Sequence, residues 1–205
     1  MHPYTTDSNE RRMILLGIAV LSILCAFALN SVSSRLDISW LWWVDVPSVF
    51  GFYGIIYTAM NRWLWRWRIL RRIGLVRVPD LNGQWHGYVS SSFDNCAERK
   101  DVLVTISQTW TRISITLHAR TSQSHSLIGA VLIGQQGEPV LSYEYMNEPK
   151  PDAPDTMHAH RGTARLVVRG EGKFLEGEYY SGRDRQNYGI LHLERETTEI
   201  GENAR

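Results

Sequence analysis

The sequence predicts a membrane-anchored all-β protein, with two N-terminal transmembrane helices followed by an eight-stranded antiparallel up-and-down β-barrel. Three observations support this fold class. Two long apolar stretches lie within the first 62 residues, a segment rich in tryptophan and arginine follows them, and after residue 77 short alternating segments are separated by turn residues. We therefore expect residues 1–77 to form a transmembrane hairpin and residues 78–205 to form the barrel.

The first predicted span covers residues 13–29. Its sequence, MILLGIAVLSILCAFAL, carries no charge and follows Arg11 and Arg12. At 1.5 Å per residue a helix of this length reaches about 25 Å, which is short but sufficient for a bilayer. A cleaved signal peptide is the alternative, because Ala26-Phe27-Ala28 has the form of a small-x-small cleavage site.

The second predicted span covers residues 41–62 and is bordered by tryptophans at both ends. Trp43 and Trp63 are twenty positions apart, about 30 Å along a helix, which matches the distance between the aromatic belts of a bilayer. Arginines follow the span within RWLWRWRILRR, residues 62–72. By the positive-inside rule, this basic aromatic collar and the arginines before the first span place both the N- and C-termini in the cytoplasm.

The barrel prediction depends on eight alternating segments after Pro79. They cover about residues 83–92, 100–109, 111–119, 123–134, 139–147, 160–169, 173–182 and 187–195. Short strands joined in sequence favour a closed up-and-down barrel, and a β-sandwich is the alternative. The first segment opens with Gly83-Gln84-Trp85, similar to the Gly-x-Trp start of lipocalin-like barrels, so we expect Trp85 to plug one end and Arg195 to stack on it.

Alternation also predicts which side chains face the interior. Most strands present apolar residues inward, but on two strands the inward residues become polar toward one end. These inward sets are Leu141, Tyr143, Tyr145 and Asn147 on one strand, and Leu175, Gly177, Tyr179, Ser181 and Arg183 on the other. The longer loops lie at that same end. This end is therefore the expected mouth of a binding cavity.

The side chains expected at the mouth suit a small phosphorylated ligand. Tyrosine rings stack on nucleobases, arginines match phosphates, and serine, threonine and asparagine can hydrogen bond to bases or ribose. The residues that we expect to contact such a ligand are Ser91, Ser124, Tyr145, Asn147, Arg161, Thr163, Tyr179, Arg183 and Tyr188. Further side chains expected at the mouth are Ser90, Ser122, Ser126, His160 and Arg185.

Other function classes find little support in the sequence. A net charge of +1 gives no broad basic field, so no DNA or RNA partner is expected. The sequence has no glycine-rich phosphate loop, nucleophile elbow or His-Glu-x-x-His motif, so we expect neither an enzyme nor a bound cofactor. His158 and His160 could begin a zinc site, but the third ligand could only be guessed among His118, His125 and Asp155, so no metal is expected.

Five stretches in this order resemble the CD-NTase-associated two-transmembrane β-barrel effectors of bacterial cyclic-oligonucleotide anti-phage signalling (CBASS). They are PDLNGQWHGYVSSSF, ISQTWTRISITLHARTSQSHS, LSYEYMNEP, HRGTARLVV and LEGEYYSGRDRQNYGILHLER. The resemblance extends from Arg11 to Arg195. It implies that the barrel binds a cyclic dinucleotide second messenger, and that the protein forms a homo-oligomer in the lipid bilayer of the bacterial inner membrane and disrupts it.

Two alternatives belong to other functional classes. A membrane-tethered lipocalin-like carrier of an apolar ligand would need a lining that stays apolar up to the mouth. A structural membrane anchor would have a filled barrel without a cavity.

Overall fold

The computed structural model describes residues 1–35, 45–134, 137–154, 157–182 and 186–196. The chain forms two compact units, one made of Met1–Asp7 together with Val78–Arg205, and the other of Ser8–Arg77. The helical unit is therefore inserted between the first strand and the remainder of the barrel.

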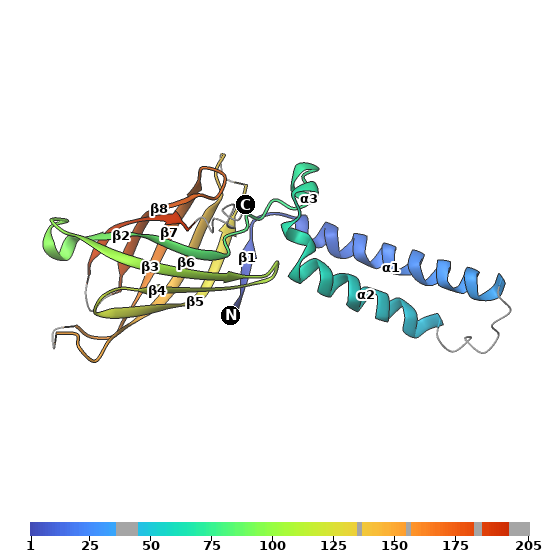
Figure 1. Cartoon of the computed structure of the whole chain (residues 1–205), viewed down its shortest axis with the longest axis horizontal. Coiled ribbons are helices and arrows are strands. Elements are labelled where there is room, and N and C mark those ends of the chain that lie inside the picture. Colours follow the sequence, from blue (N-terminus) through green and yellow to red (C-terminus); the bar gives the residue numbers. More distant parts are fainter. Residues whose placement is uncertain (36–44, 135–136, 155–156, 183–185, 197–205) are drawn as a thin grey trace, which may run out of the picture. The chain divides into compact units, whose positions relative to one another are not determined.

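The helical unit contains α1 (Glu10–Arg35), α2 (Asp45–Arg62), the 3-10 turn η2 (Leu64–Arg66) and α3 (Arg68–Arg72). Helices α1 and α2 lie side by side (Figure 1). Within the described residues, one helical segment, Glu10–Ser33, is long and apolar enough to cross a membrane, with a mean hydropathy of 2.5. The first four residues of the second predicted span, 41–44, lie outside the described residues.

The collar after α2 differs from the predicted aromatic belt at one position. Trp63 and Trp67 are 58% and 55% exposed, as expected for side chains that face a membrane interface. Trp65 is fully buried within the structure. The Glu10 carboxylate accepts a hydrogen bond of 2.7 Å from the backbone N–H of Arg77 and so ties the start of α1 to the segment that follows α3.

The second unit is a closed β-barrel, so the sandwich alternative is wrong. The predicted strands are present and antiparallel in sequence order, and their ends agree with the prediction to within about two residues. They are β2 (Gly83–Ser91), β3 (Arg99–Gln108), β4 (Arg112–His118), β5 (Ser122–Leu132), β6 (Val140–Pro149), β7 (His160–Arg169), β8 (Phe174–Ser181) and β9 (Tyr188–Arg195). A short 3-10 turn, η3 (Ser92–Asp94), follows β2.

The prediction of eight strands needs one correction, because a ninth strand, β1 (His2–Thr6), precedes the first helix. Strands β4 and β5 pair with each other only near their connecting loop, over Thr116–His118 and Gln123–His125. Beyond that point they separate, and β1 fills the gap, antiparallel to β4 and parallel to β5. A five-residue strand containing Pro3 offers too little alternation to be detected in the sequence.

Side-chain contacts hold β1 in this gap. Tyr4 is 3% exposed, and its hydroxyl donates a 2.8 Å hydrogen bond to the carbonyl of Trp110. The carboxylate of Asp7, just after the strand, accepts bonds of 2.6 and 3.0 Å from the backbone N–H groups of Ile133 and Gly134. The Ile133 bond is the main cause that lowers the pKa of Asp7.

One end of the barrel is plugged as the sequence predicts. Trp85 is fully buried, and its indole N–H donates to the carbonyl of Leu81 at 3.0 Å. The guanidinium of Arg195 lies 5.4 Å from the centre of the Trp85 ring and donates a hydrogen bond to the carbonyl of Asn82. The apolar inward residues above this plug are buried as expected, among them Val104, Ile106, Leu166, Val168 and Leu193.

Candidate functional site: a cavity in the barrel

A cavity of about 220 Å³ lies inside the barrel, above the apolar core. Its lining combines apolar side chains with polar and aromatic ones. The apolar residues include Val102, Ile115, Leu117, Ala164 and Leu191. The polar and aromatic residues are Ser91, Phe93, Lys100, Thr121, Ser122, Ser124, Ser126, Tyr143, Tyr145, Asn147, His160, Tyr179, Ser181 and Asn187.

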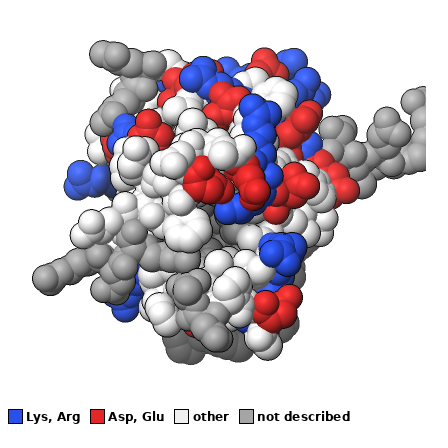
Figure 2. Space-filling view, turned by 90° about the vertical axis from the view of Figure 1, so that its left-hand side faces the viewer, with Lys and Arg blue, Asp and Glu red and all other residues white. Residues whose placement is uncertain are grey.

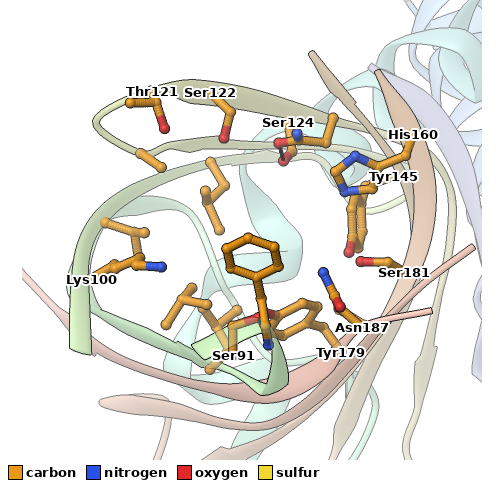
Figure 3. Close-up of a pocket in the computed structure, with 18 of the residues that line it drawn as sticks. Ser91, Lys100, Thr121, Ser122, Ser124, Tyr145, His160, Tyr179, Ser181 and Asn187 are labelled. Atoms are coloured by element: carbon orange, nitrogen blue, oxygen red, sulfur yellow. Dashed lines mark hydrogen bonds between the residues drawn. The ribbon is translucent and has the colours of Figure 1, made fainter. Parts of the chain in front are cut away.

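The loops around the mouth are at the left-hand end of the barrel in Figure 1. Figure 2 looks at this end. Basic and acidic side chains gather over one half of the face, and uncharged side chains cover much of the other. Figure 3 shows side chains from several strands pointing into the cavity, including Ser91, Lys100, Ser124, Tyr145 and Tyr179.

The two tyrosines near the mouth lie beside glycines on neighbouring strands. Tyr145 on β6 pairs with Gly162 on β7, and Tyr179 on β8 pairs with Gly189 on β9. A Cβ atom at Gly162 would overlap the Tyr145 hydroxyl, and one at Gly189 would overlap the Tyr179 ring. The glycines therefore let each ring lie against the wall of the barrel, which leaves space in its centre.

Burial raises the pKa of two cavity tyrosines further above neutral pH. It raises the pKa of Tyr143, which is 6% exposed, and the neighbouring Tyr145 raises it further. Burial also raises the pKa of Tyr179, and a hydrogen bond with Ser91 opposes part of this shift. Both hydroxyl groups therefore keep their protons at neutral pH and can donate hydrogen bonds to a ligand.

Hydrogen bonds also orient the polar side chains on the opposite wall. The Ser124 hydroxyl donates to Oδ1 of Asn147 at 2.9 Å across β5 and β6, and both side chains are buried. On β7, Nδ1 of His160 lies 3.0 Å from the carbonyl oxygen of His158. These contacts fix the amide and the imidazole at the cavity surface before any ligand arrives.

Among the described lining residues, Lys100 is the one lysine or arginine. Its Nζ lies 3.0 Å from Oδ2 of Asp94 in η3. The hydrogen bond from Lys100 is the main cause that lowers the pKa of Asp94. We did not predict Lys100 as a ligand contact, although alternation with the inward Val102, Val104 and Ile106 places it on the inner face.

The structure brings five of the nine predicted contact residues together. Ser91, Ser124, Tyr145, Asn147 and Tyr179 all line the cavity. The lining also contains several residues that the predicted contact set omitted, such as Phe93, Thr121, Ser181 and Asn187. Phe93, Thr121 and Asn187 lie in loops or turns, where strand alternation gives no direction.

Three predicted contact residues lie on the outer face of the barrel instead. Arg161 is exposed, and one of its guanidinium nitrogens is 3.8 Å from the Glu144 carboxylate. Thr163 is exposed on the same strand, and Tyr188 is 60% exposed on β9. Strand alternation explains all three, since their neighbours His160, Gly162, Ala164 and Gly189 take the inward positions. The ninth residue, Arg183, lies outside the described residues.

In the described part of the chain, no three His, Cys, Asp or Glu side chains come together in a way that could hold a metal ion. His158 and His160, which the sequence suggested as possible ligands, contact each other through the carbonyl of His158.

Comparisons with known proteins agree with this architecture. Residues 76–195, which include β2 to β9, match the family model described as the Cap15 cyclic dinucleotide receptor domain. The chain is 29% identical over 147 residues to CD-NTase-associated protein 15 of Yersinia aleksiciae, covering 71% of this chain and 68% of the relative. It is also 29% identical over 143 residues to CD-NTase-associated protein 15 of Staphylococcus schleiferi, covering 69% and 75%. The chain therefore belongs to the Cap15 family, whose barrel is a cyclic dinucleotide receptor domain.

Proposed function

We propose that this protein is an anti-phage effector that binds a cyclic dinucleotide in its barrel cavity, forms a homo-oligomer and disrupts the bacterial inner membrane. The observation that carries the proposal is a cavity lined by tyrosine, serine and asparagine side chains within the matched receptor domain. The ligand contacts are proposed among Ser91, Ser124, Tyr145, Asn147 and Tyr179.

The lining has the chemistry that a nucleotide needs. The rings of Tyr145, Tyr179 and Phe93 can stack on bases. The amide of Asn147 and the serine hydroxyls can hydrogen bond to base edges or ribose. The cavity, about 220 Å³, is smaller than the roughly 300–1,000 Å³ of typical ligand pockets, so a dinucleotide must also occupy the mouth between the loops.

The position of β1 supports a hairpin that enters and leaves the membrane on the same side. The helical unit is joined to the barrel unit at both ends, by Asp7 and by Val78. A barrel on one side of a bilayer then requires an even number of crossings, which α1 and α2 would supply. Helix α2 has 18 residues, or about 27 Å, close to the thickness of the hydrocarbon layer.

The same connection argues against a cleaved signal peptide. Cleavage after Ala28 would separate β1 from the chain that follows, leaving the gap between β4 and β5 without a covalently attached strand. We therefore propose that the first span is retained, with both termini in the cytoplasm.

Binding can drive assembly only if the assembled state holds the ligand more tightly than the monomer. The test uses full-length protein in lipid nanodiscs or mild detergent. Titration calorimetry against a panel of cyclic dinucleotides, with the matching linear dinucleotides as controls, should show binding of at least one cyclic ligand. That ligand should also increase the mass measured by light scattering and release dye from liposomes that contain the protein.

The absence of binding by every member of the panel would refute the proposal. A carrier of an apolar ligand is the second candidate, favoured by the apolar side chains in the cavity lining. Lipid that co-purifies with the protein and is not displaced by any nucleotide would support that alternative.

A further inference from the structure

We propose that Lys100 is the phosphate-binding residue of the cavity and that Asp94 competes with the ligand for it. This inference rests on the proposed function and concerns its specificity. A cyclic dinucleotide carries two phosphodiester groups, so its recognition needs at least one cation within reach.

The position of Lys100 suits this role. It is the first inward-facing residue of β3, it lies opposite Val89 in the register of β2, and it points into the cavity near Ser91 (Figure 3). The described lining residues include no aspartate or glutamate. The carboxylate that contacts Lys100 belongs to Asp94 in η3, at the rim of the mouth.

A ligand phosphate can replace the Asp94 carboxylate as the partner of Lys100. The Lys100 side chain is 50% exposed, so an anion can reach its Nζ, whereas the two carboxylate oxygens of Asp94 have almost no exposed surface. Exchange of the Asp94 carboxylate for a phosphate keeps an anion at Nζ, so the Lys100 charge stays paired. A phosphate that entered the cavity could take the place of the Asp94 carboxylate at Nζ.

The segment that carries Asp94 is the short turn η3, which lies outside the strands. η3 is held by the backbone N–H of Tyr188, which donates to the Ser92 hydroxyl at 3.0 Å, and by the Phe93 N–H, which donates to the Ser91 hydroxyl at 3.3 Å. Asn95 and Cys96, just after it, have φ angles of 55° and 59°, a region that side chains other than glycine seldom adopt. The same turn carries Phe93, a cavity residue.

The pair of substitutions Lys100→Ala and Asp94→Asn tests the competition, because they have opposite expected effects. The ligand is whichever cyclic dinucleotide of the panel binds the full-length wild-type protein most tightly, measured by calorimetry. Lys100→Ala should weaken binding about 10- to 100-fold, since it removes a hydrogen bond between charged groups, and Lys100→Arg should restore most of the affinity. Asp94→Asn should strengthen binding about two- to fivefold, because it removes the competitor.

Two variants provide matched controls for charge. Asp101→Asn removes one negative charge from the outer face of the same strand, and Lys173→Ala removes one positive charge from the turn between β7 and β8. Both should bind the ligand as the wild type does. Affinity should also fall between about 50 and 300 mM salt in the wild type and fall less in Lys100→Ala, a difference that loss of packing alone would not produce.

The outcomes separate this inference from the proposed function. If the wild type binds a cyclic dinucleotide and both Lys100→Ala and Asp94→Asn keep its affinity, the inference is wrong and the proposed function stands. If Asp94→Asn weakens binding as much as Lys100→Ala does, Asp94 supports the site and does not compete for it. A wild type that binds no member of the panel overturns both proposals. Tighter binding by Asp94→Asn supports the inference and cannot result from misfolding.

Discussion

Replacing Tyr4 with alanine should destabilise the barrel by about 3 to 5 kcal/mol, if β1 is a structural strand of it. Tyr4 is 3% exposed, and its hydroxyl donates to the carbonyl of Trp110 at 2.8 Å. Truncating a buried aromatic side chain costs about this much, because apolar burial is lost and a cavity remains. Tyr4→Phe keeps the ring and removes only the hydroxyl, so it should cost roughly 0.5 to 1.5 kcal/mol.

The assay is thermal unfolding of the full-length protein in detergent, followed by the circular dichroism of the β-sheet, because six of the eight tryptophans lie outside the barrel. A loss of 3 to 5 kcal/mol should lower the midpoint by about 10 to 20 °C. Tyr180→Ala is the matched control, because Tyr180 is 51% exposed on the outer face and its removal should change the midpoint little. Equal midpoints for Tyr4→Ala and Tyr180→Ala would refute the assignment of β1 to the barrel core.

Three further predictions concern the site and the stability of the barrel. Tyr145→Ala should weaken cyclic dinucleotide binding by about 5- to 150-fold in calorimetry, the range for loss of one stacked ring, and an unchanged affinity would move the stacking site elsewhere. The Ile133 N–H lowers the pKa of Asp7 in the folded protein. The ionised carboxylate therefore stabilises the fold above the pKa that Asp7 has in the unfolded chain, and this stabilisation is lost as the pH falls through the pKa of the folded protein. Melting curves between about pH 2 and 6 should show this loss, and Asp7→Asn should reduce it. Arg195→Ala should cost about 0.5 to 2 kcal/mol through loss of the contact with Trp85, whereas a melting point equal to that of the wild type would mean that the stack contributes nothing.

The local pattern of the sequence was enough to predict most of the barrel wall. Because a strand alternates its side chains with a period of two, each segment indicates its own inner face. Tyr143, Tyr145 and Asn147 were predicted to face inward in this way, and the structure confirms it. The same rule, applied from Ala164, would have placed Arg161 and Thr163 on the outer face. Their chemistry made them attractive as ligand contacts, but their position in the strand excludes them from the cavity.

Other features depend on contacts between segments that are distant in the chain. The separation of β4 from β5 follows from the closed geometry of the barrel, and only this separation gives the first residues of the chain a place to pair. The approach of Asp94 to Lys100 is a local contact instead, and it depends on the conformation of the η3 turn between β2 and β3. The sequence by itself thus determined the strands, their inner faces and the plugged end, because these follow from periodicity and local turns. Only the structure decided the ninth strand, because it pairs in the gap that the closed barrel leaves between β4 and β5, and the ion pair at the mouth, because it depends on the conformation of the η3 turn.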